Sequence, residues 1–114
     1  SPGQASARDA PFAAPTVSLP KPLIGLWAVS SDVCQSPDGE GWIRITENLM
    51  TGYEVALRPI EIRSVGEHTW TIESEENYLG TQFAMVRQTL SLDGATLTVQ
   101  PEGGQSEAYL RCGE

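Results

Sequence analysis

Short runs of alternating apolar and polar residues, separated by turn residues, make up the chain from Leu23 onward. In one run Ile43 and Ile45 alternate with Arg44 and Thr46, and this period of two places the isoleucines on one face of a half-buried strand. Runs of this kind predict strands at residues 23–30, 42–47, 53–58, 60–63, 68–73, 83–92, 95–99 and 107–112. No long window has the 3.6-residue period of an amphipathic helix.

Turn signals separate these runs at intervals of about ten residues. The strongest are residues 37–39, Pro-Asp-Gly, and residues 93–94, Asp-Gly, and the polar residues 74–77 predict a further loop. About eight short strands with tight connections predict an all-β fold, a single antiparallel meander closed into a small barrel. Closure is expected because it removes exposed strand edges. A β-sandwich is the alternative.

The longest run, residues 83–92, changes the parity of its apolar positions. Phe83 and Met85 fall on one phase, whereas Leu90 and Leu92 fall on the other. A one-residue slip exchanges the two faces of a strand. We therefore expect a β-bulge or bend near Gln88.

The N-terminal residues 1–22 differ in composition from the rest. They contain Pro2, Pro11, Pro15, Pro20 and Pro22 among Ala, Ser, Gly and Gln. Because proline lacks the backbone donor that sheets and helices use, this segment predicts a flexible Pro/Ala-rich arm or linker. Residues 23–114 then form the β-barrel domain. The chain starts at Ser1 without Met, and we expect a processed terminus from which any signal peptide has been removed.

The two cysteines, Cys34 and Cys112, lie near the ends of the predicted barrel. A disulfide between them is expected to stabilise the fold by about 4.5 kcal/mol in the chain-entropy model. It links the two ends of the meander and indicates an oxidising compartment, periplasmic or secreted. Two unrelated buried thiols are the alternative.

The formal net charge of −8 restricts the partners. Nucleic acid and anionic membranes both require a basic surface, and no cluster of basic residues is present. The charge favours neutral molecules, cations or a protein with a positive patch. No apolar stretch is long enough for a membrane-spanning helix, so no membrane insertion is expected.

Gly25 and Trp27 open the first predicted strand, and Arg111 lies in the last. In a closed meander these strands are neighbours, so the guanidinium and the indole are expected to stack and close the barrel. This pattern resembles the calycin barrels, which include lipocalin-like proteins and small secreted bacterial metallopeptidase inhibitors. The resemblance implies an eight-stranded barrel and, for the inhibitors, an N-terminal arm that plugs a protease active site. The chain lacks the Thr-Asp-Tyr loop of full lipocalins.

Candidate catalytic residues do not form a recognisable constellation, and no enzyme is expected. His68 is the only histidine and has no Gly-x-Ser-x-Gly nucleophile elbow with it. Glu73, Glu75 and Glu76 form the densest acidic group. We expect a plain solvated surface there, and a patch that faces a cation or a partner is the alternative.

Metal and cofactor sites are not indicated either. Asp32, Asp38 and Glu40 share one predicted loop, but they lack the spacing of a calcium-binding EF-hand. We therefore expect no metal and no cofactor.

Five aromatic residues are candidates for ligand or partner contacts. They are Trp42, Tyr53, Trp70, Tyr78 and Phe83. In a barrel of about eight strands such side chains either line a cavity or fill the interior, and the sequence leaves both open.

The leading functional hypothesis is a monomeric, non-enzymatic binding module, protease-inhibitor-like, that recognises a protein partner through loops or the N-terminal arm. Carriage of a small apolar ligand inside the barrel is the first alternative. A structural or assembly component of the cell envelope, tethered through the arm, is the second.

Overall fold

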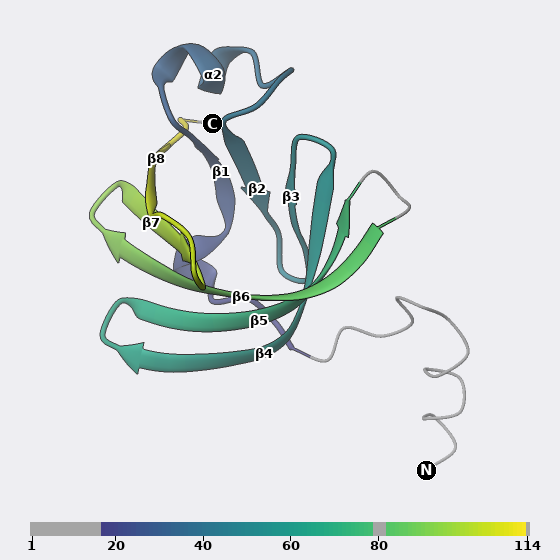
Figure 1. Ribbon diagram of the computed structural model, residues 1–114. Helices are drawn as coiled ribbons and strands as arrows, with labels where there is room; N and C mark the ends of the chain where they lie inside the picture. Colours follow the sequence, from purple (N-terminus) through teal and green to yellow (C-terminus); the bar gives the residue numbers. More distant parts are fainter. Residues whose placement is uncertain (1–16, 79–81, 114) are drawn as a thin grey trace.

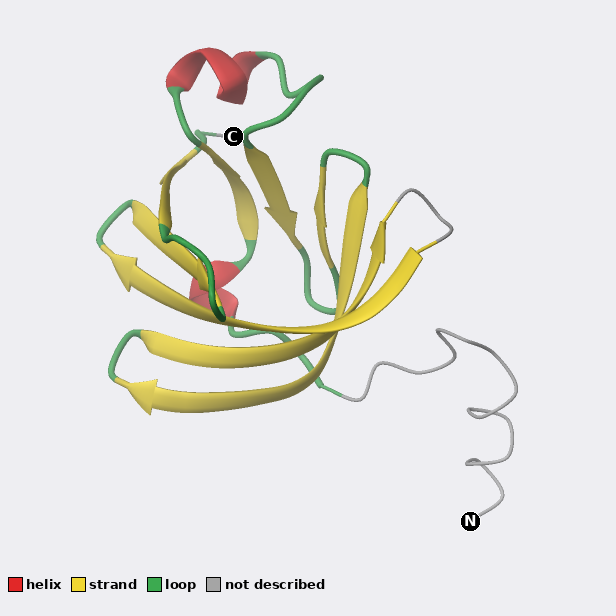
Figure 2. Cartoon of the chain, viewed as in Figure 1, coloured by secondary structure: helices red, strands yellow, loops and turns green. Residues whose placement is uncertain are grey.

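Eight antiparallel strands follow one another in sequence order, and β1 also pairs with β8, so the sheet closes into a barrel (Figure 1). The computed structural model describes residues 17–78 and 82–113. The strands are β1 (Gly25–Ala28), β2 (Trp42–Ile45), β3 (Met50–Gly52), β4 (Val55–Gly66), β5 (Thr69–Tyr78), β6 (Gln82–Asp93), β7 (Thr96–Pro101) and β8 (Glu107–Arg111). Two short helices, η1 (Lys21–Leu23) and α2 (Ser31–Gln35), flank β1 (Figure 2). The predicted all-β barrel is confirmed, and the sandwich alternative is not.

The core lies inside the barrel because alternate residues of each strand point inward. Ile45, Met50 and Leu57 show this arrangement: they lie side by side on β2, β3 and β4, and all three are buried. The buried core comprises Leu19, Leu23, Trp27, Ile45, Met50, Leu57, Ile72, Leu90, Leu97, Val99 and Tyr109.

The segment before β1 closes one end of the barrel. Leu19 and Leu23 are buried in the core, and the amide of Leu19 donates to the carbonyl of Glu47 at 2.7 Å. The indole Nε1 of Trp27 donates to the carbonyl of Leu23 at 2.9 Å. Residues 17–22, which the sequence analysis assigned to the arm, therefore lie against the barrel. Residues 1–16 of the predicted arm are outside the described residues.

The predicted disulfide between Cys34 and Cys112 is present, with a Cα–Cα distance of 5.4 Å. It joins α2, which follows the first strand, to the residue after the last strand. A small apolar cluster on the outer face of the barrel surrounds it, in which Leu26 and Ala28 are buried and Trp42 is partly buried. The helix was not predicted, because five residues are too few to show a helical period.

Strand β4 corrects the prediction of two strands at 53–58 and 60–63. It is continuous over 12 residues, with register shifts between Pro59 and Glu61 and between Ser64 and Gly66. Proline removes one hydrogen bond from the ladder, and a bulge tolerates that loss. Pro59 therefore marks an irregularity inside a strand and not the end of one.

Of the β-bulge or bend predicted near Gln88, the bulge is wrong. Strand β6 pairs with both β5 and β7 without a register shift. Phe83 and Met85 instead point outward and are 59% and 55% exposed. The change of parity has another cause: the apolar residues lie on the outer face of β6 at Phe83 and Met85 and on the inner face at Leu90 and Leu92.

The loop predicted at residues 74–77 is also wrong, since β5 extends to Tyr78. Ser74 is fully buried, and it shares its strand face with Glu76, whereas Glu75 lies on the other face. The polar composition that suggested a loop belongs to a strand with polar residues on both faces.

Candidate functional site

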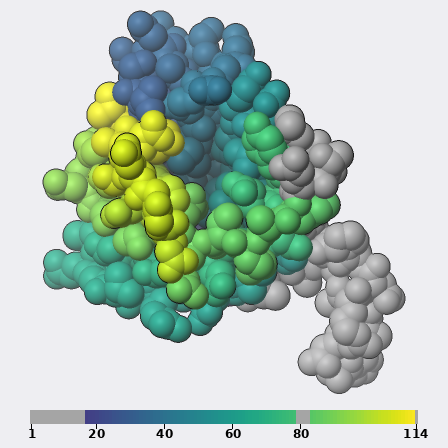
Figure 3. All heavy atoms as spheres, in the orientation of Figure 1, coloured from purple at the N-terminus to yellow at the C-terminus, as the bar shows by residue number. Residues whose placement is uncertain are grey.

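A cavity of about 680 Å³ opens at the end of the barrel opposite η1. It is bordered by Val29, which follows β1, and by the start of β2, the β3–β4 turn and the β7–β8 connection. The space-filling view shows a recess between the yellow C-terminal segment and the teal residues of β3 and β4 (Figure 3). The barrel is therefore plugged at one end and hollow at the other.

The walls of this cavity are mainly apolar. Inward-facing positions of five strands supply Ile43, Ile45, Met50, Val55, Leu57, Leu90 and Val99. These positions follow the period-2 pattern that the sequence shows in each run. Gln88 on β6 adds one amide to the wall.

The mouth of the cavity is acidic. Four glutamates border it: Glu40, Glu54, Glu76 and Glu107, hereafter the mouth carboxylates. Glu76 pairs with Leu57 across β5 and β4, and Glu107 pairs with Val99 across β8 and β7. Because paired residues share a face, these two carboxylates are held on the cavity side of rigid strands. Glu40 and Glu54 lie in connections between strands.

Two tyrosines lie among these carboxylates. Tyr53 and Glu54 form the β3–β4 turn, in which Glu54 has a φ of 62°, a left-handed conformation that is uncommon for a non-glycine residue. The negative charge of Glu54 and a hydrogen bond to its carboxylate raise the pKa of Tyr53, with smaller effects from Glu40 and Tyr78. Tyr53, Tyr78, Glu40 and Glu54 all border the cavity.

Tyr109 is the buried polar residue of the cavity wall. Its hydroxyl donates to Oε1 of Glu107 at 3.0 Å. Burial and the hydrogen bond to Glu107 raise the pKa of Tyr109 far above its ordinary value. This hydrogen bond orients one mouth carboxylate.

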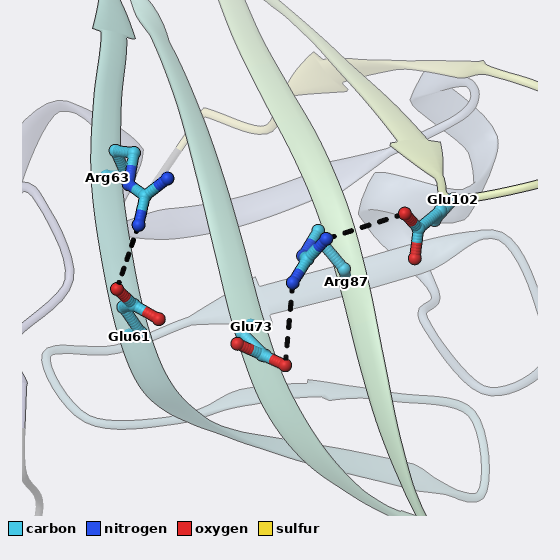
Figure 4. A network of polar contacts seen from close by, with 5 residues as sticks. All are labelled: Glu61, Arg63, Glu73, Arg87 and Glu102. Atoms are coloured by element: carbon cyan, nitrogen blue, oxygen red, sulfur yellow. Dashed lines mark hydrogen bonds and ion pairs between the residues drawn. The ribbon is translucent and has the colours of Figure 1, made fainter.

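The arginines of the described chain lie away from the cavity. Arg58, Arg63 and Arg87 lie on the outer face of β4 and β6, where they pair with glutamates. Figure 4 shows the pairs of Arg63 and Arg87. The pairs are Arg58–Glu75 (2.7 Å), Arg63–Glu61 (3.2 Å), Arg87–Glu102 (3.5 Å) and Arg87–Glu73 (3.8 Å). Arg44 is exposed on β2 and does not line the cavity.

Arg111 stacks on Trp27 as the sequence suggested. Its Cζ lies 4.2 Å from the centroid of the indole ring. Its guanidinium donates to the carbonyls of Ile24, at 3.1 Å, and Pro22, at 2.6 Å. These bonds tie β8 to the segment that plugs the closed end, so the residue is part of the barrel closure and not of the cavity.

Of the five aromatic residues singled out in the sequence, Tyr53 and Tyr78 lie at the mouth. Trp42 also borders it, but its side chain packs against the outer cluster around the disulfide. Trp70 packs against the core near the β4–β5 turn, and Phe83 is exposed on the outer face of β6.

The candidate catalytic groups are separated. Glu75 pairs with Arg58 on the outer face, whereas its neighbour Glu76 lines the cavity. His68 is exposed in the β4–β5 turn. Among the described residues no group of three or more His, Cys, Asp or Glu side chains is arranged to hold a metal ion.

The sequence reasoning did not select Glu54, Glu107 or Tyr109. The signal for Glu107 and Tyr109 was present, because they occupy alternate positions of one predicted strand and therefore share a face. Which face is inside depends on pairing with β7, and that pairing is a property of the closed barrel.

No helix within residues 17–78 and 82–113 combines the length and the apolar character that crossing a membrane requires. Comparison of the chain with models of known protein families, with curated proteins and with solved structures finds no match.

Proposed function

We propose that this chain is a non-enzymatic protein that binds a small molecule, whose apolar part enters the barrel. The observation that carries the proposal is the cavity of about 680 Å³ with apolar walls and one open end. Ligand pockets for small molecules typically measure 300–1,000 Å³ and combine apolar walls with a few polar groups.

Burial of apolar surface supplies the affinity in this proposal. Each methylene group that leaves water for an apolar wall contributes about 0.8 kcal/mol. The strands of the disulfide-linked barrel carry the residues that would contact the apolar part of the ligand, such as Leu57, Leu90 and Val99. A wall of this kind needs little rearrangement to receive a ligand, which favours binding.

A dye-binding assay tests the proposal. The full chain is titrated with N-phenyl-1-naphthylamine, a neutral dye that fluoresces in apolar surroundings. Val99→Phe fills the cavity from β7, and Gln88→Trp fills it from β6. Both variants should bind the dye at least tenfold more weakly than the unmodified chain.

Val65→Phe is the matched control, because Val65 is 55% exposed and does not line the cavity. Circular dichroism checks that each variant keeps the fold. If one filling variant does not fold, the other provides the comparison. Unchanged dye binding in a folded filling variant contradicts binding inside the barrel.

Recognition of a protein partner, in the manner of a protease inhibitor, stays a prediction, as does a role in the cell envelope. Residues 1–16, most of the arm on which both depend, lie outside the described residues. We also propose a periplasmic or secreted location, which the disulfide supports.

A further inference from the structure

We propose that the ligand of this cavity is an amphiphilic organic cation, whose ammonium or guanidinium group lies among the mouth carboxylates while its apolar part occupies the barrel. This inference rests on the proposed function and adds the chemical class of the ligand. It depends on how charge is distributed between the cavity and the outer face of the barrel.

Within residues 17–78 and 82–113, the mouth carboxylates lack the arginine partners that four glutamates of the outer face have. On the outer face, Glu61, Glu73, Glu75 and Glu102 each lie within 4 Å of an arginine. None of the mouth carboxylates forms an ion pair with any residue in 17–78 or 82–113. Four negative groups therefore surround an apolar cavity without a compensating positive charge in the described chain.

The described residues that line the cavity include no lysine and no arginine. Lys21 lies in η1 and Arg111 stacks on Trp27, both at the plugged end. An anionic ligand would bring its charge close to the mouth carboxylates without a donor cation, and like charges at such distances repel. The described lining therefore disfavours fatty acids and other apolar anions.

A cleft with one sign of charge and low-dielectric walls concentrates the field at its opening. Glu76 and Glu107 extend from the strands that form the cavity wall, so a cation at the mouth can contact carboxylates while an attached apolar chain touches Leu57 or Val99. Tyr109 donates to Oε1 of Glu107, and within residues 17–78 and 82–113 no hydrogen bond reaches its second oxygen.

The tyrosines of the mouth favour the same ligand class. Tyr53 and Tyr78 are 42% and 41% exposed at the opening, and the π face of a tyrosine attracts ammonium and guanidinium groups. Aromatic and acidic side chains together attract organic cations, whereas they give little electrostatic attraction to a neutral head group and repel an anionic one.

Other cations fit the site less well. A bound metal ion needs several converging ligands, and no such group exists among the described residues. A polyamine would leave the apolar walls formed by Ile45, Leu57 and Leu90 without a matching surface. A single cationic head on an apolar body matches both parts of the cavity.

Three ligands of one chain length test this inference: decylamine, which is cationic at pH 7, decanol, which is neutral, and decanoate, which is anionic. Each competes with N-phenyl-1-naphthylamine on the full chain at low ionic strength and below its aggregation limit. We expect decylammonium to bind about tenfold more tightly than decanol or better, and decanoate more weakly than decanol. Decanoate binding equal to or tighter than decylammonium overturns the inference.

Glu76→Gln and Glu107→Gln remove one charge each and keep the shape of the side chain. Each should weaken decylammonium binding roughly three- to tenfold and leave decanol binding unchanged. Glu61→Gln, on the outer face, is the matched control and should change neither. Equal affinities in all three variants and the unmodified chain contradict the inference.

A salt titration of the unmodified chain does not depend on the folding of any variant. Raising the salt concentration from 20 to 500 mM should weaken decylammonium binding and leave decanol binding nearly constant, because salt screens charges at the mouth.

The failure of the proposed function and the failure of the ligand class give different results. If the dye and all three ligands do not bind, the proposed function is wrong; if decanol and decanoate bind as well as decylammonium, only the ligand class is wrong.

Discussion

Removal of the Cys34–Cys112 disulfide is the perturbation whose effect can be worked out most fully. The bond spans 78 residues of sequence, nearly all of the barrel. In the chain-entropy model a loop of that length restricts the unfolded chain by about 4.5 kcal/mol at 25 °C. The free energy of unfolding of a typical domain is about 5–15 kcal/mol. The disulfide therefore contributes a large part of the stability of this fold.

The assay is thermal and urea unfolding of Cys34→Ala/Cys112→Ala, followed by circular dichroism. A loss of about 4.5 kcal/mol lowers the Tm by roughly 20–35 °C for a chain of this size. Each single variant should lose as much as the double variant, because either one breaks the bond. The unmodified chain in reducing buffer should unfold near the same temperature, and this comparison separates loss of the bond from loss of packing around Leu26 and Ala28.

A loss below about 1 kcal/mol in the double variant would refute the reasoning that the bond restricts the unfolded ensemble. So would a reduced, unmodified chain that is as stable as the oxidised chain.

Three further predictions concern single residues. Arg111→Ala removes the stack on Trp27 and the hydrogen bonds to Ile24 and Pro22. It should lower the free energy of unfolding, measured in urea, by about 2–3 kcal/mol, and Arg111→Lys should lower it by less. An unchanged stability would contradict a role of Arg111 in barrel closure. Ser74→Ala should raise stability by about 1 kcal/mol, because the Ser74 hydroxyl is buried without a hydrogen-bond partner in the described chain; a loss of stability would show that the hydroxyl has a partner. The pKa of Tyr109 is raised from 10.0 in the folded state, so the stability it contributes is fully present below pH 10 and declines as the pH rises further. Tyr109→Phe should flatten the decline of urea stability above pH 10, and an identical slope in both proteins would contradict the raised pKa.

The fold was accessible from the sequence because its signals are local. Alternation in runs such as Ile43 to Ile45, and turn residues at regular spacing, specify strands and their number. The disulfide and the Trp27–Arg111 stack followed from one further step, that the first and last strands of a closed meander are neighbours. Errors arose where local composition conflicts with pairing: Pro59 lies inside a strand, and the polar residues 74–77 lie within β5.

The site was accessible only in part. Tyr53 and Tyr78 were named as candidates, but nothing in the sequence distinguishes them from Trp70 or Phe83, which lie elsewhere. Whether an aromatic residue faces the cavity, the plugged end or the solvent depends on strand register, which is a long-range property. The three-dimensional arrangement likewise determines which carboxylates line the mouth and which pair with arginines on the outer face.

The most direct test of the central claim is a set of intermolecular NOEs between decylammonium and the full chain with labelled methyl groups. The account predicts contacts from the alkyl chain to the wall methyls of Leu57, Leu90 and Val99, and from the carbon next to the ammonium group to the rings of Tyr53 or Tyr78. Contacts confined to the outer face, such as Val65 or Met85, would contradict a ligand site inside the barrel.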